Sequence, residues 1–263
     1  VAAHAAGRTP NPCIECNRHI KFGRLLDRAR ALGFGLLATG HHARVVVRPD
    51  GTRRIARAAD AAKDQSYVLH MLDQDQLASL LLPIGDLTKD EVRRRAAGLG
   101  LRTADKPDSQ DVCFITREHG REDFLRRSLT LTPGRVVDGS GAEVGSIAAV
   151  ELVTVGQRRG MALAGGAAPR FAVDVDVAGA TVTVGSIDDL MVDATPLEAF
   201  SWADGPVVGR VLVQTSAHGS CDPAVLDDGV VRWAEPRPRV ALGQSVVFYD
   251  GDQVLGGSIA RRA

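Results

Sequence analysis

The sequence predicts an α/β domain built on a parallel sheet, followed by a small β-rich central domain and a C-terminal β-barrel. We place these domains at residues 1–125, 126–195 and 196–263. Three observations support this order. The first part alternates helix, short apolar strand and glycine turn. From Gly134 onward glycine and β-branched residues become frequent, and several short strands fill the last part of the chain, as in a small barrel.

Two of the four cysteines stand near the start, in the spacing Cys13-x-x-Cys16. Pro10 and Pro12 fix their own φ angles and push the residues before them toward extended conformations. We therefore expect a stiff loop carrying both thiols, with a helix beginning at Asn17. A thiol near a helix N-terminus and close to basic side chains is expected to have thiolate character.

The next segments follow the α/β pattern. Apolar positions at helical spacing predict a helix over residues 21–32, and residues 36–40 predict a short buried strand. Ligands of parallel sheets bind at the carboxyl ends of strands, which is where Gly40 and His41 fall. Residues 43–58 predict a hairpin around Pro49-Asp50-Gly51.

Helical signals continue to residue 131. A helix is expected to open at Lys63-Asp64-Gln65 and to run through Leu77. Thr88 and Glu91 form a capping box for a second helix, whose buried face would be Val92, Ala96 and Leu99. Residues 123–131 predict a third, short helix. A solvated helix start is an equally good interpretation of Lys63 and Asp64.

Period-two alternation marks the β-rich parts. Strands are expected over residues 170–177, 180–184, 207–215, 230–235, 246–250 and 254–261. In residues 154–161, Arg158 and Arg159 lie between glycines, which suits contact with a backbone anion or an ordinary basic turn. Cys221 falls in a loop between strands, where a lone cysteine is most often a packing residue.

Composition excludes several classes of protein. The 263 residues hold 32 basic and 32 acidic side chains, so any RNA contact must be a local basic patch. Four cysteines in a chain of this length do not make a disulfide scaffold. There is no secretory signal and no apolar run long enough to span a bilayer, so we expect a cytoplasmic protein without a membrane partner. Because the first residue is Val1, we also expect an N-terminal part to be absent.

The cysteines allow several kinds of chemistry. Cys13-x-x-Cys16 could be half a zinc site, but Cys113 and Cys221 supply no second pair. A thioredoxin-like redox pair is disfavoured because no fitting βαβ unit is visible. Our central hypothesis is that Cys16 and Cys113 face each other and carry out sulfur chemistry. An iron–sulfur cluster held by Cys13, Cys16 and Cys113 stays open as an alternative.

Five motifs together resemble the bacterial tRNA-specific 2-thiouridylases. They lie at residues 7–22 (Gly-Arg-Thr-Pro-Asn-Pro-Cys-Ile-Glu-Cys-Asn-Arg-His-Ile-Lys-Phe), 38–41 (Ala-Thr-Gly-His), 63–67 (Lys-Asp-Gln-Ser-Tyr), 108–115 (Asp-Ser-Gln-Asp-Val-Cys-Phe-Ile) and 154–160 (Thr-Val-Gly-Gln-Arg-Arg-Gly). Each motif alone is weak, but all five occur in the family's order through most of the chain. The resemblance implies a partial pyrophosphate-loop fold in the first domain.

The resemblance also implies an activity: ATP, with Mg²⁺, adenylates the C2 oxygen of the wobble uridine in tRNA, and a cysteine persulfide supplies sulfur. By motif match, Cys113 resembles the persulfide carrier and Cys16 the second catalytic cysteine. Gly40 matches an ATP contact. The segment that contacts the target base in the family matches Asn11, Pro12 and Cys13. A second tRNA-contacting segment of the family matches Lys63, Asp64 and Gln65. A cysteine desulfurase or relay protein is implied as the sulfur donor.

Three departures from the family pattern matter: a missing phosphate loop, Cys13 where some relatives have Asp, and residues 146–149 (Ser-Ile-Ala-Ala) where the family often has a His-x-Gly segment. The family begins with a Ser-Gly-Gly-Val-Asp-Ser loop that holds the ATP phosphates through backbone amides, and these residues contain no such loop. A polypeptide of these residues alone is therefore expected not to adenylate uridine. The alternatives are a [4Fe-4S]-dependent thiolation through Cys13, Cys16 and Cys113, or a non-catalytic tRNA-binding module.

Overall fold

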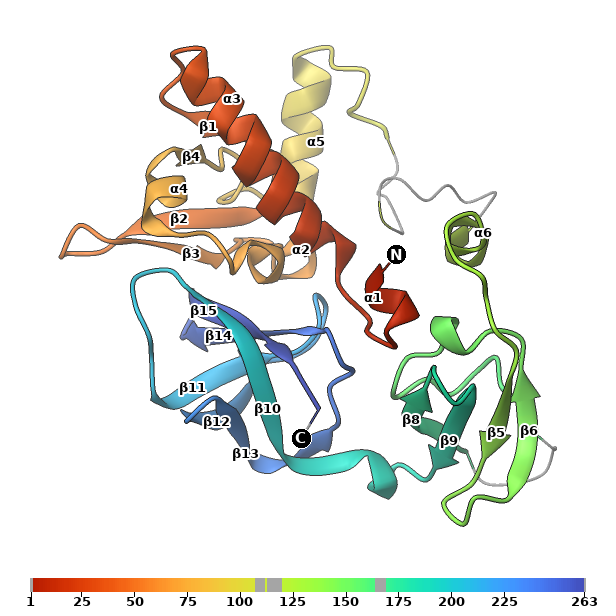
Figure 1. Ribbon diagram of the computed structural model, residues 1–263. Coiled ribbons are helices and arrows are strands. Elements are labelled where there is room, and N and C mark those ends of the chain that lie inside the picture. Colours follow the sequence, from red (N-terminus) through yellow and green to blue (C-terminus); the bar gives the residue numbers. More distant parts are fainter. Residues whose placement is uncertain (1, 107–111, 113–119, 164–168, 263) are drawn as a thin grey trace.

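The computed structural model describes residues 2–106, 112, 120–163 and 169–262. Figure 1 shows the predicted sequence of parts: helices with short strands first, then a separate β-rich unit, and a barrel at the C-terminal end. The predicted mixed α/β fold is therefore confirmed. In the described residues no helix is long and apolar enough to cross a membrane.

The cysteine-bearing helix begins at Pro12, five residues earlier than the sequence analysis expects. After α1 (Ala2–Ala5), the elements α2 (Pro12–Cys16), η1 (Asn17–Leu25) and α3 (Leu26–Ala31) follow one another directly, with a kink at Gly23, whose φ of -98° and ψ of -106° are not helical. Asn11 is the N-cap, and its side chain accepts hydrogen bonds from the amides of Cys13 and Ile14. Pro12 occupies the first helical position, where its fixed φ and missing N–H cost nothing. The expected loop through Cys16 is therefore wrong.

A short parallel ladder confirms the predicted parallel pairing. Strand β1 (Leu37–Ala38) pairs with β4 (Leu80–Leu81). The expected burial is wrong: Leu36 is 53% exposed, because in the described chain β1 pairs on one edge only. The capping box of Thr88 and Glu91 at α5 (Lys89–Gly98) is confirmed. Its expected buried face is also wrong, since no α5 residue is buried and Leu99 is 75% exposed.

The predicted hairpin is present and joins the barrel. Strands β2 (Ala43–Val47) and β3 (Arg53–Arg57) pair antiparallel, and Ala56 of β3 pairs with Gln253 of β15 (Gln253–Ala260). After it, the expected single helix is replaced by η2 (Ala61–Lys63), η3 (Ser66–Leu69) and α4 (Gln74–Ala78). The helix is interrupted because Asp73 forms a new N-cap with its own capping box.

The central unit is a small sheet with its own core. Its elements are α6 (Gly120–Arg126), β5 (Gly134–Val137), β6 (Glu143–Ile147), η4 (Val150–Leu152), β7 (Ala162–Leu163), β8 (Phe171–Asp176), β9 (Thr181–Gly185) and η5 (Asp188–Leu190). The strand order is β7-β6-β5-β9-β8, around a buried cluster of small apolar side chains such as Val136 and Val182. The predicted strands at 170–177 and 180–184 are confirmed as β8 and β9.

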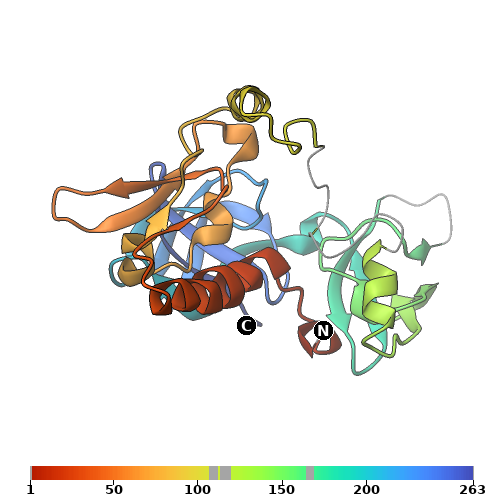
Figure 2. The same cartoon turned by 90° about the horizontal axis from the view of Figure 1, so that it is seen from above.

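The C-terminal strands close into a barrel. They are β10 (Met191–Trp202), β11 (Gly209–Gln214), β12 (Asp222–Asp227), β13 (Val230–Pro238), β14 (Ser245–Asp250) and β15. Closure occurs because β10 pairs with both β13 and β15. The sequence analysis did not predict β10 or β12. In both views β10 runs from the central unit into the barrel, and α1 lies between the two (Figure 1 and Figure 2).

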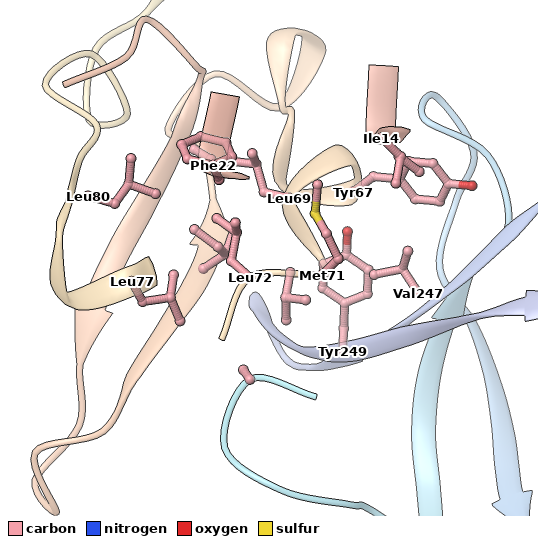
Figure 3. Packing of buried hydrophobic residues seen from close by; sticks show 14 residues of the cluster. Ile14, Phe22, Tyr67, Leu69, Met71, Leu72, Leu77, Leu80, Val247 and Tyr249 are labelled. Carbon is pink, nitrogen blue, oxygen red and sulfur yellow. The ribbon is translucent and has the colours of Figure 1, made fainter. Parts of the chain in front are cut away.

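One apolar cluster joins the cysteine-bearing helix to the barrel. Ile14 and Phe22 of the helix share it with Tyr67 and Leu69 and with Tyr249 of β14. Figure 3 shows Ile14 beside the Tyr67 ring, and the β14 side chains next to the N-terminal ones. Burying a side chain such as Ile14 contributes about 2 kcal/mol. The helix position is therefore fixed by the same packing that holds the barrel.

His70 is a buried polar group in this interface. Its side chain is 1% exposed, and Nδ1 lies 3.3 Å from the Ser201 hydroxyl of β10. Gly257 of β15 packs against the ring so closely that a Cβ there would lie 2.4 Å from Nδ1. Burial, with Arg18 nearby, lowers the pKa of His70 from 6.5 to about 3.

Acidification is expected to destabilise the fold through His70. Between pH 7 and pH 5 the unfolded chain binds a proton at this histidine that the folded chain refuses, which lowers the free energy of unfolding by about 2 kcal/mol. The contribution is fully present above pH 6.5 and is lost as the pH falls toward 3. Urea unfolding at pH 7 and at pH 5 measures this loss. The free energy of unfolding should change less between the two pH values in His70→Gln than in the wild type. An equal dependence in both proteins would rule out His70 as a source.

Candidate functional site

Helix α2 carries two thiols, those of Cys13 and Cys16, at or near the protein surface. Cys13 is exposed, Cys16 is half-buried, and neither forms a disulfide with a described cysteine. Three residues apart on a helix, the two side chains lie on the same side, one turn apart. Ile14 between them is buried in the core, so it anchors this turn. The structure thus places both cysteines, with Asn11 and Pro12, at one helix N-terminus.

A second element of the site is the loop after β1. Thr39 still pairs with Leu81 of β4 through its backbone amide, at 3.0 Å, and Gly40 follows as an exposed residue. A Cβ on Gly40 would touch only Ile84 Cδ1 at 4.0 Å, so space is open around it. Gly40 therefore lies at the carboxyl end of a parallel strand, as the sequence predicts, with room for a ligand.

Lys21 and His41 tie the helix to this loop. Lys21 Nζ lies 3.2 Å from His41 Nε2, and Thr39 Oγ1 lies 2.8 Å from His41 Nδ1. Burial, reinforced by the Lys21 cation, lowers the pKa of His41 from 6.5 to about 4. The ring is thus neutral at pH 7, accepts from Lys21 at Nε2 and donates from Nδ1 to Thr39. The cysteine helix and the strand end are held as one unit.

The segment 63–67 lies at the contact between the N-terminal part and the barrel. The Asp64 side chain is 7% exposed and binds Arg57 at 2.8 Å, the Ser66 hydroxyl at 2.7 Å and the Ala58 amide at 2.9 Å. Gln65 accepts from the His42 amide at 2.9 Å, while Lys63 is partly exposed. The acceptor oxygens of Asp64 are therefore used inside the protein, and its contact with tRNA stays a prediction.

Arg57 is the centre of a network that sequence reasoning missed. Its guanidinium donates to Gln214 at 2.8 Å and to the Cys221 sulfur at 2.9 Å, and its Cζ lies 4.3 Å from the centre of the Tyr249 ring. Burial raises the pKa of Cys221, and Arg57 offsets part of this rise. The thiol is thus neutral and packed, as a structural cysteine should be. The Arg-x-x-x-x-x-x-Asp spacing carried no recognisable signal.

Cys113 and most of its motif lie outside the described residues. The proximity of Cys16 and Cys113 therefore stays a prediction. In the described part of the chain, no group of three or more His, Cys, Asp or Glu side chains is arranged to hold a metal ion. The cluster alternative depends on Cys113 and stays open for the same reason.

The residues before the helix run between the two β-rich units. We call residues 7–10 the strap. Within it, the Thr9 amide donates to the Leu242 carbonyl of the barrel at 2.7 Å, and its hydroxyl lies 3.4 Å from that of Thr154 in the central unit. Arg8 forms an ion pair with Glu198 of β10. The strap thus connects the cysteine helix to both units.

The glutamine–arginine motif organises the loop that the strap touches. Gln157 accepts from the Thr154 amide at 3.2 Å and donates to the Arg159 carbonyl at 2.7 Å. Arg158 and Arg159 are exposed, with Gly156 and Gly160 at positive φ on either side. An exposed pair of arginines on a rigid turn can contact a phosphate backbone, so both interpretations made from the sequence remain open.

Comparison with known families covers nearly the whole chain. Residues 1–117 match a family model described as a tRNA methyl transferase HUP domain. Residues 122–186 match a tRNA methyl transferase PRC-barrel domain, and residues 212–260 match an aminomethyltransferase beta-barrel domain.

Curated relatives match over the same length. The tRNA-specific 2-thiouridylase MnmA of Acidothermus cellulolyticus is 45% identical over 271 residues, covering 100% of this chain and 74% of the relative. The enzyme of the same name from Kineococcus radiotolerans is 48% identical, covering 97% of this chain and 73% of its own length. The enzyme of the same name from Chloroflexus aurantiacus is 45% identical, covering 99% of this chain and 75% of its own length. The likeness thus extends well beyond the short motifs.

Proposed function

The chain belongs to the tRNA-specific 2-thiouridylase family, and from this premise we propose how it thiolates the wobble uridine of tRNA. It is a tRNA-uridine sulfurtransferase. The family uses ATP, for which the HUP domain is suited. We assign the sulfur to a persulfide on Cys113, the resolving thiol to Cys16, and a role in ATP binding to Gly40, with Mg²⁺ accompanying the nucleotide.

The observation that supports this assignment most is the joining of Cys16 to the strand end. Lys21, one turn beyond the thiol along the helix, holds His41 directly after Gly40. A nucleotide at Gly40 and a thiol on the helix are then fixed relative to each other. Such fixed geometry accelerates a reaction because the reactants need not be brought together by diffusion.

The proposed chemistry proceeds in three balanced steps. The uridine C2 oxygen attacks the α-phosphate of ATP, and pyrophosphate leaves. The terminal sulfur of the Cys113 persulfide then attacks C2, forms the carbon–sulfur bond and displaces AMP. Finally the Cys16 thiolate attacks the Cys113 sulfur, which breaks its bond to the transferred sulfur and releases 2-thiouridine. This leaves a Cys16–Cys113 disulfide, which an external thiol must reduce.

The tRNA contacts follow from the surface around this centre. We propose that Asn11, Pro12 and Cys13 touch the target base, because they stand together at the helix start, where Cys13 is exposed and the other two are half-buried. Lys63, Asp64 and Gln65 would contact the tRNA nearby, and the Asp64 carboxylate also holds their turn through Arg57 and Ser66. We retain the division at residues 1–125, 126–195 and 196–263, with tRNA spanning the three domains. A cysteine desulfurase or a sulfur-relay protein would load Cys113.

The activity is tested with a polypeptide that carries the family's phosphate loop ahead of these residues, by thiolation of transcribed tRNA with ATP, a persulfide donor and a reductant. We expect a 2-thiouridine product, detected by mass spectrometry of the digested RNA, that requires both ATP and reductant. Product formed without ATP would contradict the adenylation step. Product that accumulates through many turnovers without reductant would contradict the role of the two cysteines.

Charge reversal at the strap is expected to slow turnover. In Arg8→Glu the side chain faces Glu198, and this repulsion displaces the residues that lead into the cysteine helix. We expect kcat to fall by about tenfold with little change in KM, because tRNA binding surfaces are kept. The double variant Arg8→Glu with Glu198→Arg should recover most of kcat. Failure of the double variant to recover would refute positioning through this pair.

A cluster-dependent reaction is the second candidate, because Cys13 and Cys16 lie one turn apart on the same helix face. With Cys113 they could hold a [4Fe-4S] cluster that delivers sulfide. Anaerobic reconstitution with iron and sulfide would give a visible absorbance band that Cys13→Ser loses. An unchanged band in Cys13→Ser, or none in the wild type, would count against this candidate.

For a polypeptide of these residues alone, a non-catalytic tRNA-binding module is the remaining alternative, supported by the exposed arginines of the 154–160 loop. Gel shifts with tRNA over a salt series would show affinity falling steeply as salt rises. Binding of this kind, in a protein that fails the thiolation test with all co-substrates present, would favour the module.

A further inference from the structure

A cavity lies where the strap meets the two β-rich units. Its volume is about 380 Å³, and we call it the junction cavity. Residues of the strap, the loop before the glutamine–arginine motif, β8, β10, the β13–β14 loop and the C-terminal end line it. A cavity of this size holds a small organic ligand rather than a few water molecules. The proposed chemistry makes no use of it.

Basic side chains surround the cavity. Arg239, Arg261 and Arg262 line it, against one acidic side chain, Asp174. Arg262 is paired with Asp174 at 2.8 Å, and Arg261 donates to the Leu197 carbonyl at 3.1 Å. Arg239 is exposed, and its guanidinium has no hydrogen bond or ion pair with any residue that the structure describes. The cavity therefore carries a net positive charge with one arginine available to a ligand.

The cavity wall combines a buried polar residue with an apolar surface. Thr195 of β10 is 4% exposed, and its Oγ1 accepts the indole N–H of Trp233 at 3.0 Å. Valine side chains such as Val155, Val175 and Val192 form the neighbouring wall. A ligand that fits has an anionic group and a compact, weakly polar body.

We propose that the junction cavity binds a nucleotide unit: a phosphate held by Arg239, with its sugar against the valine wall. Arginine is the preferred partner of phosphate, and the ribose presents both carbon surface and hydroxyl groups. The unit could come from a single-stranded part of the RNA or from a free mononucleotide. Only the RNA source rests on the proposed function, because nucleotide binding can be measured without any thiolation.

The test uses calorimetric titration of the full chain with UMP, inorganic phosphate and single-stranded tetrauridylate. Arg239→Glu should weaken UMP binding by at least about tenfold, because a phosphate then meets a carboxylate. The matched control is Arg232→Glu on β13. Arg232 is also exposed, but it lines a separate hollow on the barrel with Arg210 and Asp250. The Arg232→Glu variant should bind UMP with the affinity of the wild type.

Each outcome decides the proposal. The proposal is supported if UMP binding is saturable and is weakened by Arg239→Glu but not by Arg232→Glu. In that case, an affinity for tetrauridylate above that for UMP identifies RNA as the source. Equal affinities identify the mononucleotide. Inorganic phosphate should bind about tenfold more weakly than UMP, because it makes no contact with the valine wall. Absent UMP binding, equal loss in both variants, or phosphate binding as tight as UMP would overturn it. Loss of thiolation with intact UMP binding would instead count against the proposed function.

Discussion

Replacing Cys16 by serine is expected to lower multiple-turnover thiolation by at least about a thousandfold while the protein stays folded. A serine hydroxyl does not attack a sulfur–sulfur bond at neutral pH, so the transferred sulfur would remain attached to both Cys113 and the base. Cys16 is half-buried beside the well-packed Ile14, and losing its sulfur removes little apolar contact. Product measured over time by mass spectrometry, with thermal melting as a fold check, provides the test.

Two control variants sharpen this prediction. Cys221→Ser should keep near-normal turnover, because the thiol is neutral and packed against Arg57. Cys13→Ser changes a residue proposed to touch the target base, so it should lose no more than about tenfold in turnover if a persulfide carries the sulfur, and lose turnover entirely if a cluster does. Turnover by Cys16→Ser within tenfold of the wild type would remove that thiol from the mechanism.

Replacing Asp64 by alanine is expected to lower the free energy of unfolding by roughly 3 kcal/mol. The change leaves the Arg57 cation without its carboxylate partner in a half-buried site, and it removes the acceptor for the Ser66 hydroxyl and the Ala58 amide. Urea unfolding followed by circular dichroism measures the loss. A surface pair gives the matched control: Glu122→Ala, which breaks the exposed pair with Arg126, should cost well under 1 kcal/mol.

The same comparison separates structure from recognition in this segment. Lys63→Ala should weaken tRNA binding and leave stability unchanged, because its side chain is partly exposed. Asp64→Ala should lose both stability and tRNA affinity, because the carboxylate holds the turn that carries Lys63 and Gln65. If Asp64→Ala unfolds like the wild type but binds tRNA poorly, the carboxylate contacts RNA directly and the network around Arg57 is unimportant.

Local chemistry made much of the fold predictable. Thr88 and Glu91 predict the start of their helix, because a capping box involves residues only three apart in the sequence. Pro49-Asp50-Gly51 predicts its hairpin, because a turn is likewise set by neighbouring residues. The misplaced start of the cysteine helix had a readable signal as well. Asn11 followed by Pro12 is an N-cap with proline at the first helical position, and the proline was interpreted as a loop signal instead.

Long-range pairings left no such signal. In the sequence, nothing distinguishes Arg57 and Asp64 from surface charges. In the folded chain, Gln214 and Tyr249 of the barrel lie against Arg57. Strand β10 was missed because it bridges two units and has no strict alternation of buried residues. Of the site, the sequence indicated the cysteines and Gly40 through motifs, whereas the Lys21–His41 pair and the junction cavity depend on segments that meet only in the folded chain.

The most direct test of the central hypothesis is to map disulfides after a single turnover without reductant. The protein, loaded with persulfide and mixed with tRNA and ATP, would be alkylated, digested and analysed by mass spectrometry. We expect a peptide pair joined through Cys16 and Cys113, in an amount equal to the 2-thiouridine formed, and none without ATP. Stoichiometric 2-thiouridine with both thiols recovered free and alkylated would contradict it.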